Sequence, residues 1–238
     1  MLITMYVTQS VRLRLFFFIL LATVTVTPVF SQLQRITGEK IPIVHLDNLI
    51  QGRVYFSLYP RIEGSQYLLN DWSLGDIRMQ NRVYQELPLL YDIYSDDLIL
   101  LHLQEHSFNL INLVKEYIQD FSLGDRHFIN LAYSSYNETG LKMGFYELLY
   151  EADISLLSKR RHLLKTEDAI SSFDRKDLKY LIKEGQGYRI TNKKSLITAM
   201  GQSRKKTISS FLKKQKIFLK RANDQQLVQL AKYLNTLQ

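Results

Sequence analysis

The chain has 238 residues, 46% of them hydrophobic, and a formal net charge of +8, a composition typical of a folded domain rather than a disordered one. It has no cysteine, which excludes disulfide bonds, thiol catalysis, thiolate metal ligands and the lipid-modified cysteine of a bacterial lipoprotein. The charge divides unevenly, because residues 32–158 carry nine Lys/Arg against seventeen Asp/Glu and residues 159–238 carry twenty against six.

Residues 1–31 predict a cleavable export signal. Arg12 and Arg14 precede an apolar run that begins at Leu15, and small residues near Ser31 suit a signal peptidase. A membrane anchor is the alternative, but the run is about twelve residues long, whereas a spanning helix needs about twenty. We therefore expect cleavage after Ser31, no membrane span in the mature chain, and a location in the periplasm or at the cell surface.

Residues 32–192 predict a β-rich domain. Its first expected strand is 53–59, with alternate residues such as Val54 and Phe56 on one face. The centre of the domain is the stretch 64–103, in which apolar residues alternate on either side of three turn signals. Such a pattern is typical of a tight antiparallel meander, and we expect this stretch to be the structural centre of the chain.

Within this central stretch, residues 80–82 suit a tight turn because asparagine tolerates positive φ, and residues 95–97 form a second turn. Pro88 lies inside the long predicted strand 83–94. Since proline cannot donate a hydrogen bond to a neighbouring strand, this strand must lie at an edge of the sheet or bend at Pro88. The aliphatic run 98–103 predicts a strand that is buried on both faces.

Further hairpins follow the central stretch. Residues 108–121 are ambiguous, because Ile111, Val114 and Ile118 lie at helical spacing while the first residues alternate, and we expect a strand that leads into a short helix. Glycine or acidic residues then mark the turns between pairs of alternating segments. The predicted hairpins span residues 121–132, 143–164 and 178–191.

In residues 193–238 the apolar spacing changes from two to three and four residues, which predicts helices. Gly201 ends the first helix, and Ser203 is the expected cap of the second. Asn223, with Gln226 three residues later, forms a capping box that opens the last helix. The predicted fold class is therefore α+β: a large antiparallel β-meander, curved or folded into a sandwich, with three short C-terminal helices packed on the sheet.

The strongest local charge feature is the basic run around the second predicted helix. Two interpretations remain open: the charges form a solvated face docked on the acidic half of the chain, or they bind an anionic partner such as lipid headgroups or an acidic polysaccharide. An envelope protein is a further candidate partner, and nucleic acid is not expected because an exported protein rarely meets it. The change of charge near Ser158 is the predicted location of function. The candidate binding residues are Arg204, Lys205, Lys206, Lys213 and Lys214.

No residue pattern predicts a catalytic residue, a metal site or a cofactor. His102 and His106 are spaced i, i+4, but the HExxH pattern of zinc proteases is absent. Asp92, Asp96 and Asp97 form the densest acidic group, and a turn suffices to explain Asp96 and Asp97 because turn aspartates bind their own backbone. The chain also lacks a Gly-x-Ser-x-Gly motif and a glycine-rich phosphate-binding loop.

A set of short motifs follows in chain order: Gly75-x-Ile77, Tyr84, Leu89-x-Tyr91-Asp92-Ile93-Tyr94-Ser95-Asp96-Asp97-Leu98, Lys159-Arg160, and Tyr233-Leu234-Asn235 near the end of a lysine-rich helical tail. In this pattern the chain resembles exported proteins of unknown function found in gliding-type Gram-negative bacteria. The resemblance covers most of the chain after residue 31. It implies a cell-envelope location and a β-rich body with a helical C-terminus, and it implies no activity.

Together these observations predict an exported, non-enzymatic envelope protein with a binding or scaffolding role. The first alternative is a secreted hydrolase or carbohydrate-active enzyme that gathers carboxylates from distant strands, and a cavity holding two or more carboxylates of perturbed acidity would favour it. The second alternative is a lipid carrier, which requires a sheet curled around an apolar pocket. A flat apolar or basic patch would favour a binding role.

Overall fold

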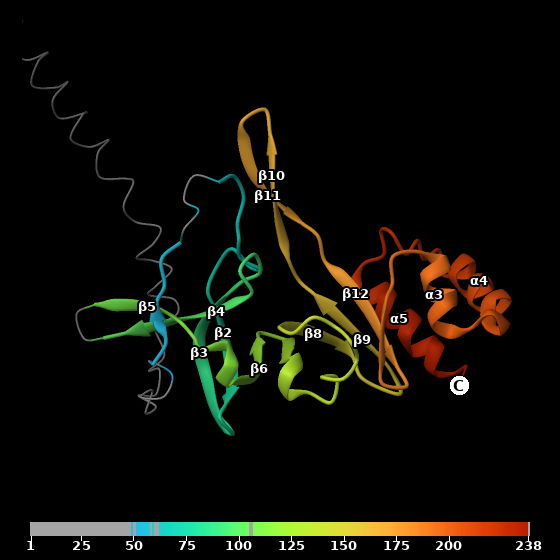
Figure 1. Ribbon diagram of the computed structural model, residues 1–238, viewed down its shortest axis with the longest axis horizontal. Helices are drawn as coiled ribbons and strands as arrows, with labels where there is room; N and C mark the ends of the chain where they lie inside the picture. The colour runs from blue at the N-terminus through green and yellow to red at the C-terminus, as the bar shows by residue number, and fades with distance from the viewer. Residues whose placement is uncertain (1–48, 50, 58, 60–61, 105–106, 238) are drawn as a thin grey trace, which may run out of the picture. The chain divides into compact units, whose positions relative to one another are not determined.

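The computed structural model describes residues 49, 51–57, 59, 62–104 and 107–237 (Figure 1). All of them belong to one compact unit, residues 44–238. The expected signal segment, residues 1–31, lies outside the described residues. Among the helices that the structure describes, none combines the length and the apolar character that a membrane crossing needs.

Eleven strands form one antiparallel sheet. They are β1 (Arg53–Val54), β2 (Ser73–Met79), β3 (Arg82–Asp92), β4 (Asp97–Leu103), β5 (Phe108–Asn112), β6 (Ile118–Leu123), β7 (Arg126–Asn130), β8 (Phe145–Tyr150), β9 (Ile154–Lys159), β12 (Leu178–Lys183) and β13 (Gln186–Arg189). The strand order is β1-β5-β4-β3-β2-β6-β7-β8-β9-β12-β13. The chain therefore runs as a meander from β2 to β5, returns beside β2 as β6, and continues as a meander in the other direction. This confirms the predicted α+β fold with a large antiparallel meander, built as a single sheet.

The turn at residues 80–82 and the bend at Pro88 follow from local backbone chemistry. Gln80 and Asn81 adopt φ angles of 50° and 63° between β2 and β3, which is the left-handed pair that a two-residue hairpin needs. β3 is an internal strand that pairs with β4 only from Leu89 onward. A bulge at Glu86, where φ is 54°, bends the chain just before the proline. Pro88 therefore follows the bulge at a point where β3 is paired with β2 but not yet with β4, so its missing N–H leaves no bond to β4 unmade.

Two segments are less regular than the sequence predicts. The strand expected over 53–59 is confined to β1, and Val54 and Phe56, which were expected on one face, are both exposed. The helix expected within 108–121 is a single 3₁₀ turn, Lys115–Tyr117, between β5 and β6. In both cases pairing with a neighbouring strand, which the local pattern does not specify, decides the backbone conformation.

The predicted hairpin 143–164 is also too long, because its second strand ends at Lys159. The chain then forms a separate two-stranded ribbon of β10 (His162–Glu167) and β11 (Ile170–Arg175). Asp168 and Ala169 make its turn, with φ angles of 49° and 64°. Alanine seldom adopts this left-handed conformation, so the sequence carries no signal for a turn there.

The first apolar cluster is formed by buried side chains of the central strands of the sheet. Its largest fully buried side chains are Tyr91, Phe121, Phe128 and Phe145, from β3, β6, β7 and β8. Their ring centroids lie 4.8 to 5.9 Å apart in stacked and edge-to-face pairs. Buried aromatic pairs of this kind each contribute about 0.5–1.5 kcal/mol beyond the area that they bury, so this cluster anchors the centre of the meander.

The second apolar cluster joins the sheet to the helices α3 (Lys193–Met200), α4 (Lys205–Lys214) and α5 (Asp224–Asn235). Leu227 and Leu234 of α5 are buried against Ile154 of β9 and Leu181 of β12. Most contacts of α5 with the sheet are with β8 and β9 (Figure 1). The helical stripe predicted from the 3.6-residue period is thus the surface by which α5 covers this part of the sheet.

Both ends of α5 are fixed by side-chain hydrogen bonds. Asn223 and Gln226 form the predicted capping box, each side chain accepting from the other residue's backbone N–H. At the other end, Asn235 accepts a hydrogen bond from the backbone N of Ile154 and donates one to its carbonyl oxygen, both at 2.9 Å. Because the side chain of Asn235 pairs with the first residue of β9, the helix end and the strand start are tied together.

Candidate functional site

The five basic residues singled out in the sequence lie at the two ends of α4. Arg204 directly precedes the helix, Lys205 and Lys206 are its first two residues, and Lys213 and Lys214 are its last two. The four lysines are exposed, and Arg204 is partly buried. Seven residues of an α-helix rise about 10 Å, so Lys206 and Lys213 lie about that far apart along one exposed side.

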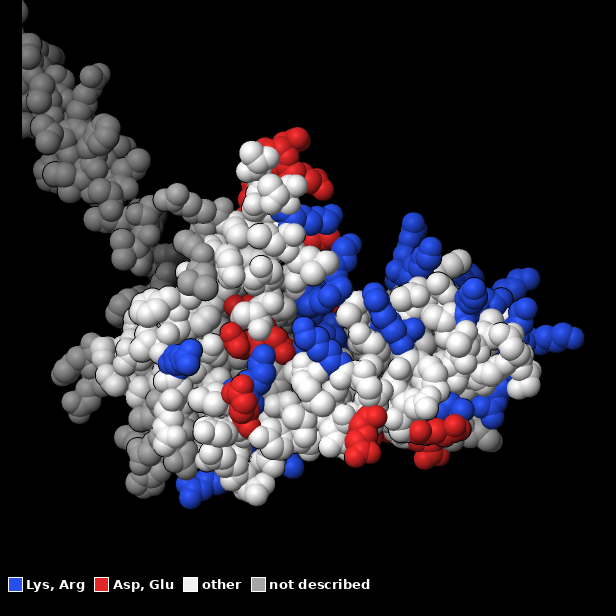
Figure 2. Space-filling view, viewed as in Figure 1, with Lys and Arg blue, Asp and Glu red and all other residues white. Residues whose placement is uncertain are grey.

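The opposite side of α4 is apolar and buried, as predicted. Ile208 and Leu212 belong to the cluster that joins the helices to the sheet. Phe211 stacks on Tyr233 of α5, with ring centroids 3.8 Å apart and the planes within 4° of parallel. This packing fixes the rotation of α4 about its axis and keeps its lysines outward. Figure 2 shows Lys and Arg gathered over α3 and α4.

α4 begins without a capping side chain, so the prediction that Ser203 caps it is wrong. Gly201 ends α3 with φ at 91°, and a 3₁₀ turn, Gln202–Arg204, then delays the start of the next helix. Arg204 occupies the cap position and makes no cap hydrogen bond, and the first turn contains no acidic residue. Lys205 and Lys206 therefore stand at the end of the helix whose dipole disfavours positive charge.

The lysines of α4 do not neutralise the acidic half of the chain. Within the part of the chain that the structure describes, none of the five basic residues at α4 forms an ion pair. Arg204 acts only at longer range: the pKa of exposed Glu184 is lowered chiefly by its hydrogen bond with Lys183, and to a smaller degree by the charge of Arg204. The described contacts thus favour a solvent-facing basic surface over a docked one.

The loop between α4 and α5 continues the basic surface and adds an exposed aromatic ring. Phe218 is 73% exposed, although a ring of this size normally contributes its area to a core. Next to it lies a hollow of about 660 Å³. Sequence reasoning missed this feature, and its one signal was the Ile-Phe-Leu run between lysines. The hollow is lined by apolar Leu212, Ile217, Phe218 and Leu219, by basic Lys193, Lys213, Lys216, Lys220 and Arg221, and by Asn192 and Ser209.

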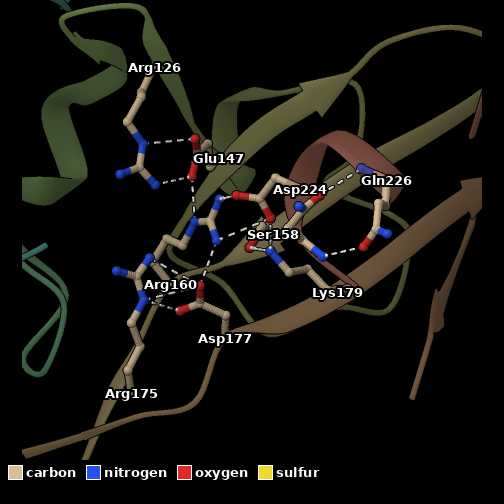
Figure 3. Close-up of polar contacts among 10 residues, drawn as sticks. Arg126, Glu147, Ser158, Arg160, Arg175, Asp177, Lys179, Asp224 and Gln226 are labelled. Carbon is tan, nitrogen blue, oxygen red and sulfur yellow. Dashed lines mark hydrogen bonds and ion pairs between the residues drawn. The ribbon is translucent and has the colours of Figure 1, made fainter. Parts of the chain in front are cut away.

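A second concentration of charge is buried where the sheet meets the β10–β11 ribbon (Figure 3). Arg160, which follows β9, is only 2% exposed. Its Nε donates to Glu147, and its two Nη atoms donate to Asp177 and Asp224, each at 2.5 Å. Arg126 binds the same Glu147 through two parallel hydrogen bonds of 2.9 and 2.6 Å. We call this group, completed by Arg175 and Lys179, the Arg160 cluster.

Pairing decides the acidity of the carboxyl groups in this cluster. Burial opposes ionisation of Asp224, but hydrogen bonds from Arg160 and Lys179 outweigh it and hold the pKa of Asp224 at about 2. The pKa of Asp177 is also lowered, because hydrogen bonds from Arg175 and Arg160 outweigh its burial. For Lys179 the main effect is burial, which lowers its pKa, and the nearby positive charge of Arg160 acts in the same direction. Both aspartates are therefore ionised, and both are already paired with basic side chains of the cluster.

A hollow of about 500 Å³ opens beside the Arg160 cluster. It holds two carboxylates, Asp177 and Asp224, together with Arg175 and Lys179, which already pair with them. A cavity with two carboxylates of perturbed pKa was expected to favour an enzyme, but both pKa values here are lowered. A general acid needs a pKa raised towards the working pH, and neither carboxyl group here has one.

The charge boundary near Ser158 is an internal junction. Ser158 is buried and its Oγ accepts a hydrogen bond from Lys179 at 3.0 Å. Lys159 pairs with Asp96 at 2.7 Å, and Arg160 pairs with Glu147. At this boundary the acidic and basic halves of the chain therefore attract each other directly, unlike the lysines of α4.

The turn aspartates do more than the sequence indicated. Asp92 accepts hydrogen bonds from the backbone N of Tyr94 and of Ser95, at 2.9 and 3.0 Å, as a turn residue should. Asp96 has a left-handed turn conformation, with φ at 66°, but its carboxylate also pairs with Lys115 at 3.1 Å and accepts from the hydroxyl of buried Tyr91 at 2.6 Å. Asp96 is thus an ion-pair partner as well as a turn residue.

Among the residues that the structure describes, no group of three His, Cys, Asp or Glu side chains is placed to hold a metal ion. His102 lies in β4, partly buried, and its Nδ1 has no described hydrogen-bond partner. His106, the other half of the i, i+4 pair, lies outside the described residues. Comparison of the chain with protein-family models, with curated proteins and with solved structures found no match.

Proposed function

We propose that this chain is an exported, non-enzymatic protein of the cell envelope, located in the periplasm or at the cell surface, in which α4 binds an anionic partner. Export rests on the pattern of residues 1–31. The binding role rests on one observation above the others: the lysines of α4 face outward from a packed helix without ion-pair partners among the described residues. The partner classes that fit are anionic lipid headgroups and acidic polysaccharide.

The placement of Lys205 and Lys206 supports a binding role. An uncapped first turn with two positive charges costs helix stability, because the dipole favours negative charge there. An anionic partner that approaches this end supplies the negative charge that the helix dipole favours there. A helix start with two lysines and no acidic residue in its first turn is therefore more stable beside an anionic partner than alone.

The expected affinity can be bounded. A Lys or Arg near an anionic membrane contributes about 1 kcal/mol, so the four lysines of α4 together supply about 4 kcal/mol, or roughly a thousandfold, at low salt. This attraction weakens as the Debye length falls from about 30 Å at 0.01 M salt to about 8 Å at 0.15 M. Salt-sensitive binding of moderate strength is therefore the signature of the proposed function.

The two alternative functions have less support. A hydrolase would need a carboxyl group of raised pKa, and the pocket beside the Arg160 cluster instead holds two ionised, paired carboxylates. A lipid carrier would need an apolar pocket enclosed by the sheet. The hollow with an apolar lining lies instead among α3, α4 and the loop that follows α4, which is a surface position.

The proposal is tested with the full chain as its host exports and processes it, by measuring co-sedimentation with anionic vesicles and retention on an acidic polysaccharide. Replacing Lys205, Lys206, Lys213 and Lys214 with glutamine should weaken binding at least about tenfold at low salt. The matched control replaces Lys165 of β10 and Lys176, which directly follows β11; both lysines pair with Asp174, and their replacement should leave binding unchanged. Failure of the wild-type protein to bind any anionic surface at low salt would overturn the proposal.

A further inference from the structure

The loop between α4 and α5 presents its aromatic ring on a defined backbone. The end of α4 closes with a hydrogen bond from the N of Ile217 to the carbonyl of Leu212 at 2.9 Å, while Lys216 takes the left-handed conformation with φ at 53°. The N of Arg221 then donates to the carbonyl of Phe218 at 2.8 Å and closes a tight turn. We call residues 218–221 the Phe218 turn.

Burial alternates along the start of the Phe218 turn, although the side chains there are all apolar. Ile217 is buried in the cluster that joins the helices to the sheet, and Leu219 packs partly against the same cluster. Phe218 points away from it and stays exposed. The packing of Ile217 and Leu219 therefore anchors the backbone of the turn, so that docking through Phe218 needs little further ordering of the main chain.

The charges around the ring are all of one sign. Lys216, Lys220 and Arg221 surround Phe218 in sequence, and all three are exposed. Lys193 and Lys213 line the adjacent hollow, and among the described residues no acidic one does so. An apolar ring and an apolar hollow framed by five positive charges match a surface that is anionic at its boundary and apolar beneath it.

We propose that the Phe218 turn docks on a lipid bilayer that contains anionic lipids, with Phe218 entering the boundary between headgroups and acyl chains. This inference rests on the proposed function, and it names lipid as the anionic partner. The lysines and Arg221 contact phosphate groups at the depth of the headgroups, while their alkyl stems extend along the apolar surface. The hollow beside the ring offers acyl-chain carbon the partly exposed side chain of Leu219 and the small exposed parts of Leu212 and Ile217.

Two other occupants fit the same surface less well. An acidic polysaccharide satisfies the charges but has little hydrocarbon to place against the ring and the hollow. A second copy of this chain would bring five positive charges against five, and like charges placed across an interface cost several kcal/mol. Charge complementarity and the need for apolar contact are met together by an anionic membrane surface.

Phe56 provides a matched comparison within the chain. Its ring is also 73% exposed, and it also lines a hollow, of about 270 Å³. That hollow is lined by Asp92 and Asp97 in addition to Arg53, so an anionic membrane would be repelled there. Equal exposure with opposite electrostatic surroundings predicts opposite behaviour of the two rings at a membrane.

The experiment uses vesicles of equimolar phosphatidylcholine and phosphatidylglycerol, vesicles of phosphatidylcholine alone, and polygalacturonate. The full chain, as processed by its host, should bind the anionic vesicles at low salt, and Phe218→Ser should bind about 5- to 10-fold more weakly. Phe56→Ser should bind as the wild type does. Both variants should unfold thermally as the wild type does, since both rings are exposed.

A fluorescence measurement reports the position of the ring itself. Trp72 is the only tryptophan, so a Trp72→Phe chain can carry a single new tryptophan through Phe218→Trp or, as the control, Phe56→Trp. Adding anionic vesicles should shift the emission of the Phe218→Trp chain to shorter wavelength and leave that of the Phe56→Trp chain unchanged. An unshifted emission at position 218 under conditions of vesicle binding would overturn the inference.

The remaining outcomes separate the inference from the proposed function. Binding to anionic vesicles that Phe218→Ser does not weaken, or binding to polygalacturonate without binding to vesicles, would overturn the inference and leave the proposed function intact. A wild-type dimer that Phe218→Ser dissociates in the absence of lipid, with no vesicle binding, would identify a second copy as the occupant and overturn it too. If the wild-type chain binds no anionic surface, both the inference and the proposed function are overturned.

Discussion

Two regions of this molecule hold dense positive charge, and they use it in opposite ways. Arg160 is buried and hydrogen-bonded to three carboxylates, whereas the lysines of α4 are exposed and make no described ion pair. The first arrangement joins strands, ribbon and α5 at one point. The second leaves charge available to a partner. Charge density in a sequence therefore does not show whether the charges are paired; the number of carboxylates within reach in the folded chain decides that.

The largest effect is expected at the buried cluster. Arg160→Met should destabilise the protein by about 3–5 kcal/mol, because Glu147, Asp177 and Asp224 lose their shared partner. Chemical denaturation monitored by circular dichroism measures the change. Arg161→Met, at the next residue, is the matched control: its Nε bonds only the carbonyl of Lys176 at an exposed site, so it should cost about 0.5 kcal/mol or less. Equal costs would contradict the assignment of Arg160 as the hub.

The same cluster should make stability depend on acid pH. The pKa of Asp224 is about 2 in the folded chain against an ordinary 3.8. Because the folded pKa is the lower one, the contribution is complete above about pH 4 and is lost as pH falls towards 2. The side chain is 39% exposed, so solvent screening reduces the contribution to about 1–2 kcal/mol.

Asp224→Asn should therefore show a smaller loss of unfolding free energy between about pH 5 and pH 2 than the wild type shows. Urea unfolding at a series of pH values checks this. Its control is Asp71→Asn, at an exposed position before β2. If the wild type and Asp224→Asn lose stability in parallel, the ion pair of Arg160 with Asp224 contributes nothing to folding.

A smaller effect is expected where α4 ends. Lys216 adopts φ at 53°, a conformation that favours glycine, so Lys216→Gly should stabilise the protein by about 0.5–1 kcal/mol. Lys214→Gly, within the last turn of the helix, should destabilise it by a similar amount. Thermal unfolding compares the two, and destabilisation by both substitutions would mean that the helix does not end in the left-handed residue described.

The smallest stability effect should accompany the clearest loss of binding. Lys206→Glu places a negative charge in the first turn of α4, where the dipole favours it, and should stabilise the protein by a few tenths of a kcal/mol. The same substitution should weaken binding to anionic vesicles about tenfold or more. Lys206→Gln separates the two effects, with a smaller change in both. A stabilised variant that binds as the wild type does would place the anionic contact elsewhere.

Local signals in the sequence were sufficient for several elements. Asn81 predicted the turn between β2 and β3, and Gly201 predicted the end of α3. The Asn223–Gln226 pair predicted the start of α5. Each of these depends on backbone conformations and hydrogen bonds within four residues, which is why a short pattern carries the information. The β10–β11 ribbon was missed because Ala169 gives no such signal.

The candidate site was predictable only in part. The basic residues of α4 and the apolar stripe beneath them follow from helical periodicity. The exposure of Phe218 did not, because an aromatic residue between two aliphatics normally predicts core. The cap of α4 was misplaced, since the 3₁₀ turn after Gly201 depends on how α3 and α4 meet.

By itself the sequence determined the alternation of strands, the change to helices after residue 192 and the amphipathic character of α4, because each follows from a repeat of two or 3.6 residues along the chain. Only the tertiary structure decided which charges are paired. The hydrogen bond from Arg160 to Asp224 spans 64 residues, and that from Arg160 to Glu147 crosses the boundary between the acidic and basic halves. No local pattern encodes pairs of residues so far apart in the chain. The packing of α5 and the ribbon on the sheet decides these pairs, and it leaves the basic residues of α4 and Phe218 facing outward.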